Sequence, residues 1–248
     1  MRVILVALAL AVTPVAVAGS IPAPTVLPRA PFPAPATDAD STPSRFVLVS
    51  SRYRDPGILP PDLPAAPDWA PDAYRGAALE SAFRQGSKVF LVYEGRYLIG
   101  ANARNQSLRY AFDLSALSRP PNRAEFEAIT WAREVDGMLY VSNSHATYAA
   151  QTKGRNAYVS AIDVRTGKLR WRSPALVANA RTFVIAGDSI VAGYGFTAEP
   201  DFLYLLDRRT GKVLDRLPVP SAPEIVRLRG GTLHVRSYDR QLVVRVRR

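Results

Sequence analysis

The sequence of 248 residues contains no cysteine and only two histidines, His145 and His234. The absence of cysteine excludes disulfides, thiolate metal sites and thiol nucleophiles. Burial alone must therefore stabilise the fold, and a structured region of roughly 200 residues is long enough to bury a large share of its surface. The spacing of the two histidines does not support a metal site.

Lysine and acidic residues are also scarce. Lys and Arg number 32 against 21 Asp and Glu, a net charge of +11, and most of the cations are arginines. A basic excess favours anionic partners such as lipopolysaccharide, anionic lipid or an acidic polymer. The alternative is an arginine-rich surface that serves solubility alone. Dispersed arginines and the predicted export do not favour a specific nucleic-acid partner.

Only one long apolar run is present, at the N-terminus. Arg2 precedes the apolar residues 3–12, Pro14 follows them, and Ala16 and Ala18 provide the small residues that a signal peptidase requires. The run is too short for a membrane-spanning helix, which takes about 20 residues. Residues 1–18 are thus predicted to be a signal peptide, without a lipid-anchoring cysteine after it, and the mature chain is expected to be periplasmic or secreted, with no transmembrane anchor.

The next segments are rich in proline. Residues 19–43 carry a proline every two to four positions and are predicted to form an extended, poorly packed linker. Residues 44–248 are the predicted folded domain, whose first strand covers 44–51. A second proline-rich loop covers 55–71, and Asp72 is placed to cap a short helix that runs to Phe83 and is terminated by Gly86.

From Lys88 onward the chain predicts strand after strand. β-branched and aromatic runs of five to seven residues alternate with two-residue turns, and no stretch shows a sustained helical period. The turns lie at Glu94-Gly95, Asp136-Gly137, Gly187-Asp188 and Gly230-Gly231. The fold class is therefore all-β, built from four-stranded antiparallel units.

A repeat in the forties supports this architecture. The string D-x-R-T-G-K occurs at Asp163 and again at Asp207, 44 residues later, and a weaker copy ends at Asp113. Each copy is interpreted as a structural turn, in which the aspartate accepts backbone N–H bonds, the glycine takes a positive φ, and a tryptophan covers the seam to a neighbouring unit. The residues of this turn are Asp163, Thr166, Gly167, Trp171, Asp207, Thr210 and Gly211. Short strands at such a period are typical of β-propeller blades.

The stretch from Ala161 to Trp171 resembles the A-x-D-x-x-T-G-x-x-x-W motif of propeller repeats of the pyrroloquinoline-quinone (PQQ) type. The second copy departs from it, with Asp215 in place of the tryptophan. The resemblance covers roughly residues 88–248 and implies a propeller, either of enzymes or of non-enzymatic envelope proteins. Those relatives use about eight blades, whereas the turns here support four to five. We therefore expect a small propeller, an incomplete ring, or half of a ring completed by a second copy.

The last strand bears on closure. Residues 241–248 alternate, with Leu242, Val244 and Val246 on one face, and residues 46–49 are expected to pair with them in one blade. Pairing of the two chain ends would remove exposed strand edges. The alternative is edge-to-edge pairing in a homo-oligomer.

No catalytic, cofactor-binding or metal-binding residue is predicted, and no cofactor. Asp163 and Asp207 are explained by the turn, and Ser144 and His145 alternate to opposite faces of a strand, which does not suit a nucleophile and its base. The candidate binding surface lies on the loops at 144–155 and 193–200, with Tyr148, Lys153, Arg155, Tyr194 and Phe196. The function favoured is an exported propeller scaffold that binds a protein or an anionic envelope component through its loops. The alternative is a small quinoprotein-like enzyme or a carbohydrate-binding propeller.

Overall fold

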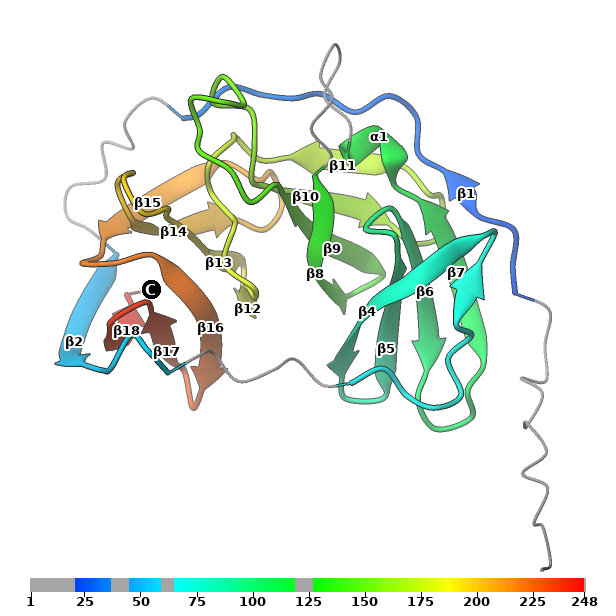
Figure 1. The fold of residues 1–248 in the computed structure, drawn as a ribbon, viewed down its shortest axis with the longest axis horizontal. Helices are drawn as coiled ribbons and strands as arrows, with labels where there is room; N and C mark the ends of the chain where they lie inside the picture. The colour runs from blue at the N-terminus through cyan, green and yellow to red at the C-terminus, as the bar shows by residue number, and fades with distance from the viewer. Residues whose placement is uncertain (1–20, 37–44, 59–64, 119–126, 248) are drawn as a thin grey trace, which may run out of the picture.

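The computed structural model describes residues 21–36, 45–58, 65–118 and 127–247. They form four antiparallel sheets, which stand side by side along an arc (Figure 1). The sheets are propeller-like blades, and the predicted all-β fold is confirmed. The predicted signal peptide and residues 19–20 and 37–43 of the predicted linker lie outside the described residues.

Blade 1 has six strands in the order β1-β7-β6-β5-β4-β3. Its antiparallel centre consists of four consecutive strands, and β1 joins their outer edge in parallel. The one short helix, α1 (Ser115–Ser118), follows this blade. The strands are β1 (Thr25–Val26), β3 (Ala73–Tyr74), β4 (Ala77–Gln85), β5 (Lys88–Tyr93), β6 (Tyr97–Asn102) and β7 (Leu108–Asp113).

Blades 2, 3 and 4 have four strands each. Blade 2 contains β8 (Ala128–Val135), β9 (Met138–Ser144), β10 (Tyr158–Asp163) and β11 (Leu169–Arg172). Blade 3 contains β12 (Val184–Ala186), β13 (Ser189–Tyr194), β14 (Phe202–Asp207) and β15 (Val213–Pro218). Blade 4 contains β16 (Pro223–Arg229), β17 (Thr232–Ser237), β18 (Arg240–Val246) and, from the other end of the chain, β2 (Phe46–Tyr53).

The pairing of the two chain ends is confirmed. β2 runs antiparallel to β18, with Phe46 opposite Val246 and Tyr53 opposite Arg240. Asp215 holds the start of β2, because its carboxylate accepts the N–H groups of Arg45 at 2.6 Å and Phe46 at 3.2 Å. The residue that departs from the repeat motif therefore anchors the strand that completes blade 4.

The repeat turn links the third and fourth strands of blades 2 and 3. Asp163 accepts the N–H of Thr166 at 2.9 Å, and Asp207 accepts that of Thr210 at 2.7 Å. Gly211 has a φ of +72°. The Trp171 indole N–H donates to the carbonyl of Arg208 in blade 3 at 3.1 Å, so its ring covers the seam between the two blades.

The register of blade 1 differs from the predicted one. β4 is the innermost strand of the blade and β5 is the second. The first hairpin of the blade is therefore the one at Gly86, which joins β4 to β5. Glu94-Gly95 joins the second and third strands instead. Asp113 ends the fourth strand and is not equivalent to Asp163. Asn102 ends the third strand and accepts the N–H of Arg104, without the D-x-R-T-G-K pattern that marks this turn elsewhere.

The predicted helix at residues 72–83 is wrong, since β3 and β4 occupy this region. β4 pairs with β5 along its length and buries Ala77, Ala82 and Phe83. Ala, Leu and Glu are good helix formers, but intrinsic helix propensity is a weak preference that tertiary context routinely overrides. Here a strand satisfies the backbone on β5 and packs side chains on both faces of the sheet.

The proline-rich segment 21–36 is extended, as expected, but it is packed against the blades. It runs over blades 1 and 2 (Figure 1), and we call it the strap. Leu27 and Ala30 are buried, β1 pairs with β7, and the Tyr158 hydroxyl donates to the carbonyl of Pro33 at 3.1 Å. Because its prolines lack N–H groups, the strap contributes mainly carbonyls and apolar contacts.

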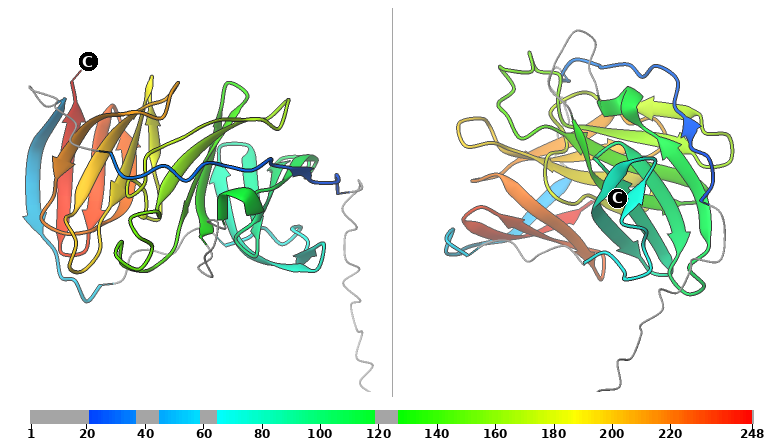
Figure 2. Two further views of the ribbon diagram at one scale, coloured as in Figure 1. Left: turned by 90° about the horizontal axis from the view of Figure 1, so that it is seen from above. Right: turned by 45° about the vertical axis from the view of Figure 1, so that its right-hand side comes forward.

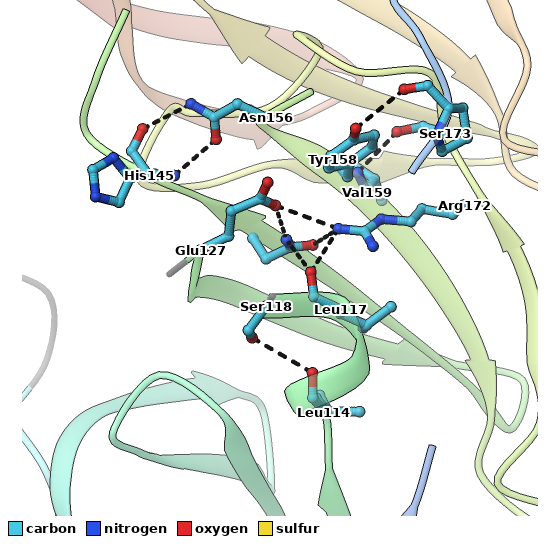
Figure 3. Close-up of polar contacts among 12 residues, drawn as sticks. Leu114, Leu117, Ser118, Glu127, His145, Asn156, Tyr158, Val159, Arg172 and Ser173 are labelled. Carbon is cyan, nitrogen blue, oxygen red and sulfur yellow. Dashed lines mark hydrogen bonds and ion pairs between the residues drawn. The ribbon is translucent and has the colours of Figure 1, made fainter. Parts of the chain in front are cut away.

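Arg172 joins the strap to the interior of blade 2. Figure 3 shows its guanidinium beside the Leu117 carbonyl and the Glu127 carboxylate. Its side chain is fully buried and donates to the carbonyls of Leu117 at 2.8 Å and Pro31 at 3.2 Å. It also lies 3.4 Å from a carboxylate oxygen of Glu127 and stacks on Tyr158, with 4.0 Å from Cζ to the ring centroid. Burial lowers the pKa of Arg172 to about 10, and the Glu127 carboxylate opposes this shift.

Side chains cap the free backbone groups of the inner strands. The Arg133 guanidinium donates to the carbonyl of Arg84 on β4 at 2.9 Å. The Gln85 side chain accepts the N–H of Glu134 on β8 at 2.9 Å. The Thr182 hydroxyl bonds both the N–H and the carbonyl of Val226 on β16, each at 2.8 Å. These bonds protect strand edges that would otherwise be open.

Substitution of Gly211 by Ala should destabilise the fold more than the same change at Gly137. Both glycines have a φ near +72°, but an added Cβ at Gly211 would lie 2.3 Å from the Trp171 ring, whereas Gly137 has open space. We expect Gly211→Ala to lower the free energy of unfolding by about 1–3 kcal/mol more than Gly137→Ala, measured by urea denaturation. Equal losses would contradict the close packing of this seam.

Substitution of Arg172 by Met should leave the Glu127 carboxylate buried without its cation. Loss of one partner of a buried ion pair costs about 3–5 kcal/mol, to be measured by the same denaturation. The control is Arg170→Met, which breaks the partly exposed pair with Asp163 and should cost clearly less than Arg172→Met. A small effect at both positions would show that Arg172 does not hold the strap.

Candidate functional site

The two predicted binding loops contact each other where they leave blades 2 and 3. Tyr148 packs edge-on against Phe196, with 4.7 Å between ring centroids. Glu199 connects the loops, since its carboxylate accepts the N–H of Ala149 and the hydroxyl of Tyr194. The structure thus brings together the three predicted aromatic residues.

The predicted cations of this surface are placed differently. Lys153 and Arg155 are exposed, on the part of the loop that turns back toward β10. Neither takes part in the aromatic contact between the loops. Tyr148 is 38% exposed, whereas Tyr194 is buried, so Tyr194 supports the loops from within and is not available to a partner.

A small cavity lies beneath the loop junction. It has a volume of about 280 Å³ and mostly apolar walls, to which Pro35 of the strap contributes. Its polar groups include the Glu199 carboxylate, already bonded to Tyr194, and the Arg216 guanidinium, which lies over Phe202 at 4.9 Å. Burial, together with the Glu199 hydrogen bond and charge, raises the pKa of Tyr194.

Asp201 is an unusual carboxylate at the base of the second loop. Its Oδ1 atom is buried and has no hydrogen-bond partner among the described residues. Burial raises the pKa of Asp201 to about 6, against the N–H of Phe196, and the Asp239 and Glu199 carboxylates add to the rise. The loop is therefore supported by a group that titrates in mildly acidic solution.

A larger hollow runs along the innermost strands of all four blades, and we call it the inner groove. Its volume is about 840 Å³. β4, β8, the segment around β12 and β16 form its walls, and none of the described acidic residues lines it. Five arginines line the groove, at least one from each blade: Arg84, Arg133, Arg208, Arg227 and Arg229.

Four of these arginines have no carboxylate within ion-pair distance among the described residues; Arg208 is the exception, 3.4 Å from Asp136 and 3.8 Å from Asp188. Arg133 lies over the Trp131 ring, 4.6 Å from Cζ to the centroid, and burial lowers its pKa. Trp131 packs in turn on Phe83 of blade 1. A guanidinium that has lost water without gaining a carboxylate is electrostatically suited to an anionic ligand.

The inner groove was missed by reasoning on the sequence, although the sequence contains a signal. Arg84, Arg133 and Arg229 each lie close before the hairpin that follows the first strand of a blade. This pattern of arginines is hidden when the hairpin at Glu94-Gly95, and not the one at Gly86, is taken as the first hairpin of blade 1. The repeat turns drew attention to Asp163 and Asp207, which lie between the third and fourth strands.

Among the described residues, no group of three or more His, Asp or Glu side chains is placed to hold a metal ion. No helix there is long and apolar enough to cross a membrane.

Comparison with known proteins finds similarity in shape only. No protein-family model and no curated protein sequence matches the chain. Among solved structures, the computationally designed Ika4 protein is 11% identical, with a TM-score of 0.46 over 72% of this chain and 96% of that one. The WD40 β-propeller domain of Doa1 is 11% identical, with a TM-score of 0.47 over 69% and 52%. BamB from Moraxella catarrhalis is 12% identical, with a TM-score of 0.33 over 66% and 71%.

Substitution of Asp201 by Asn should change how stability depends on pH. Because the folded-state pKa of about 6 exceeds the ordinary value of 3.8, the carboxyl stabilises the fold below pH 4, and this contribution is lost as the pH rises through 6. We expect Asp201→Asn to match the parent in melting temperature at pH 4 and to exceed it at pH 7.

Asp207→Asn is the control of opposite sign. Burial opposes ionisation of Asp207, but the hydroxyl and N–H of Thr210 outweigh it and lower the pKa. This variant should therefore melt below the parent at pH 7, with a smaller difference in acid. If Asp201→Asn also melted below the parent at pH 7, the inferred rise in the pKa of the buried Asp201 carboxyl would be wrong.

Proposed function

We propose that this protein is an exported β-propeller scaffold that binds an anionic partner in the inner groove. The observation that carries the proposal is the convergence of five arginines from four blades on a surface without acidic residues. Arginines dispersed for solubility would point to solvent from every blade. Other arginines, such as Arg104 and Arg165, are exposed in turns, but these five line one concave surface, which is where ligand sites usually lie.

The energetics of the groove support an anionic ligand over a neutral one. Arg84 and Arg133 are bonded to backbone carbonyls of Gly86 and Arg84, which orient the guanidiniums without neutralising them. A carboxylate, phosphate or sulfate group that entered the groove would form charge-assisted hydrogen bonds in a partly dehydrated environment. Arg133 is the central contact, because it is the most withdrawn from water of those without a carboxylate.

The loop junction is the second candidate contact, for a protein partner. Tyr148 is exposed on a loop whose position is fixed by Phe196 and Glu199. A preorganised aromatic side chain on a rigid scaffold is well suited to protein recognition. Lys153 and Arg155 on the same loop would contribute rim charges.

Membership of the PQQ-type repeat family and export are parts of the same proposal. The motif from Ala161 to Trp171 and the turn geometry at Asp163 support the first, and the pattern of residues 1–18 supports the second. The alternative, a quinoprotein-like enzyme or carbohydrate-binding propeller, would be favoured by a rise in melting temperature with PQQ and Ca²⁺ or with a neutral oligosaccharide.

Loss of the groove arginines should weaken anion binding. We expect Arg84→Gln with Arg133→Gln to reduce the affinity for a fluorescent heparin hexasaccharide by about tenfold, or 1.4 kcal/mol. The measurement is fluorescence anisotropy at 150 mM salt, where screening limits long-range attraction.

The matched control is Arg104→Gln with Arg165→Gln, which removes the same charge from exposed turns outside the groove. This control should change the affinity by less than twofold. Equal weakening by the two double variants would mean that binding follows net charge, and the groove would not be the site.

A further inference from the structure

The strand that completes blade 4 has a bare outer edge. β2 is last in the order β16-β17-β18-β2, and among the described residues no strand pairs with its other side. It is eight residues long and has no proline, lysine or acidic residue. Leu48, Val49 and Tyr53 are 48%, 49% and 67% exposed. Natural proteins normally protect an edge of this length and apolarity.

The other outer edges near the strap are protected. β1 pairs with β7, with Thr25 opposite Phe112, and so covers the outer edge of blade 1. Next to blade 2, Pro35 of the strap forms a bridge with Ala175, and Arg172 holds the carbonyl of Pro31. β2 lies at the outer margin of blade 4, at the far end of the arc (Figure 2). Within the described part of the chain, the outer strands of blades 2 and 3 are also unpaired on their outer sides, but β11 has only four residues and β15 contains Asp215 and Pro218. The edge of β2 is longer than that of β11 and lacks the proline and acidic residue of β15.

The sheet beside this edge is cationic on one face. Arg52 of β2 lies opposite Gln241 of β18, which in turn lies opposite Arg236 of β17. Arg245 of β18 lies opposite Val47 of β2. Paired residues share a face of the sheet, so these arginines are on the face that carries Val47 and Val243. Arg52 and Arg245 are exposed and have no ion pair among the described residues. The opposite face carries Phe46, Leu48 and Val244 and continues into the core.

We propose that the free edge of β2 binds an extended segment of a protein partner as a fifth strand of blade 4, and that this segment alternates acidic and apolar residues. Side chains of an added strand point alternately to the two faces. Those on one face would lie beside Arg52 and near Arg245, which favours glutamate or aspartate. Those on the other would cover Leu48, which favours aliphatic residues. The backbone supplies affinity and the alternation supplies selectivity.

A second copy of this chain fits the edge less well. β2 contains no acidic residue, so two copies paired edge to edge would bring Arg52 of each onto one sheet without compensating charge. The site is also separate from the inner groove, because β2 and β16 are at opposite edges of blade 4. The two sites can therefore be tested independently.

The probe is a fluorescent nine-residue peptide in which glutamate alternates with valine, compared with the same peptide N-methylated at alternate amides. We expect the parent peptide to bind and to slow hydrogen exchange in β2. The methylated peptide should lose at least tenfold in affinity, because it keeps the charge but cannot form the strand ladder. Equal binding of the two peptides would overturn the proposal, since charge alone would then explain it.

Variants of the full chain locate the site. Arg52→Glu with Arg245→Glu should weaken peptide binding at least tenfold, whereas Arg84→Gln with Arg133→Gln in the groove should change it by less than twofold. Leu48→Lys should block the edge, and Val49→Pro offers a second way to do so, because Val49 has no partner in β18. Thermal melting checks that each variant is folded.

Two results would overturn the assignment. One is loss of peptide binding in the groove variant but not in the edge variants. The other is a concentration-dependent dimer in sedimentation velocity that Leu48→Lys abolishes, which would assign the edge to a second copy of the chain.

Discussion

The buried guanidinium of Arg172 is the interaction on which the organisation of the molecule depends. It contacts the connection after blade 1 at Leu117, the interior of blade 2 at Tyr158 and the strap at Pro31. A buried charge is tolerated only when its environment satisfies it, so these three parts of the chain must reach their positions together. The strap is thereby a structural element of the propeller, although its sequence is typical of a linker.

The blades are held at their seams by side chains that bond to backbone. The side chains of Arg133, Gln85 and Thr182 each form a hydrogen bond with a backbone N–H or carbonyl group at the edge of a neighbouring inner strand. These bonds substitute for strand pairing without merging the blades into one continuous sheet. The same arrangement directs Arg84 and Arg133 into the groove, so the packing between blades and the charge of the groove have a common origin.

Features that depend on local chemistry could be predicted from the sequence. The D-x-R-T-G-K turns, the Gly-containing hairpins and the pairing of Phe46 with the last strand follow from φ preferences, hydrogen-bonding side chains and period-2 patterns. Features that depend on contacts with other parts of the chain could not be predicted in this way. β4 looks helical in isolation and becomes a strand because β5 lies beside it, and the strap is packed because Arg172, 141 residues away from Pro31, needs its carbonyl.

The functional surfaces divide in the same way. The aromatic loop residues Tyr148 and Phe196 were identified because loops on propellers are exposed by default, and they do meet in space. The groove required knowledge of which strand is innermost in each blade, and the repeat pattern gives this only when its register is known. Asp215 illustrates the difficulty, since a departure from the motif proved to be an anchor for β2.

The pairing of β2 with β18 also sets an order of events during folding. These strands are joined across nearly the whole length of the domain, and such long-range pairing is slow because loop closure must precede it. The antiparallel strands of blades 1 to 3 pair with neighbours in sequence, so these sheets require neither β2 nor β18. Until β18 pairs with both β17 and β2, blade 4 consists of the two-stranded β16-β17 sheet, with β2 unpaired on both sides. A chain that lacks β18 would thus expose the apolar strand β2 on both of its edges.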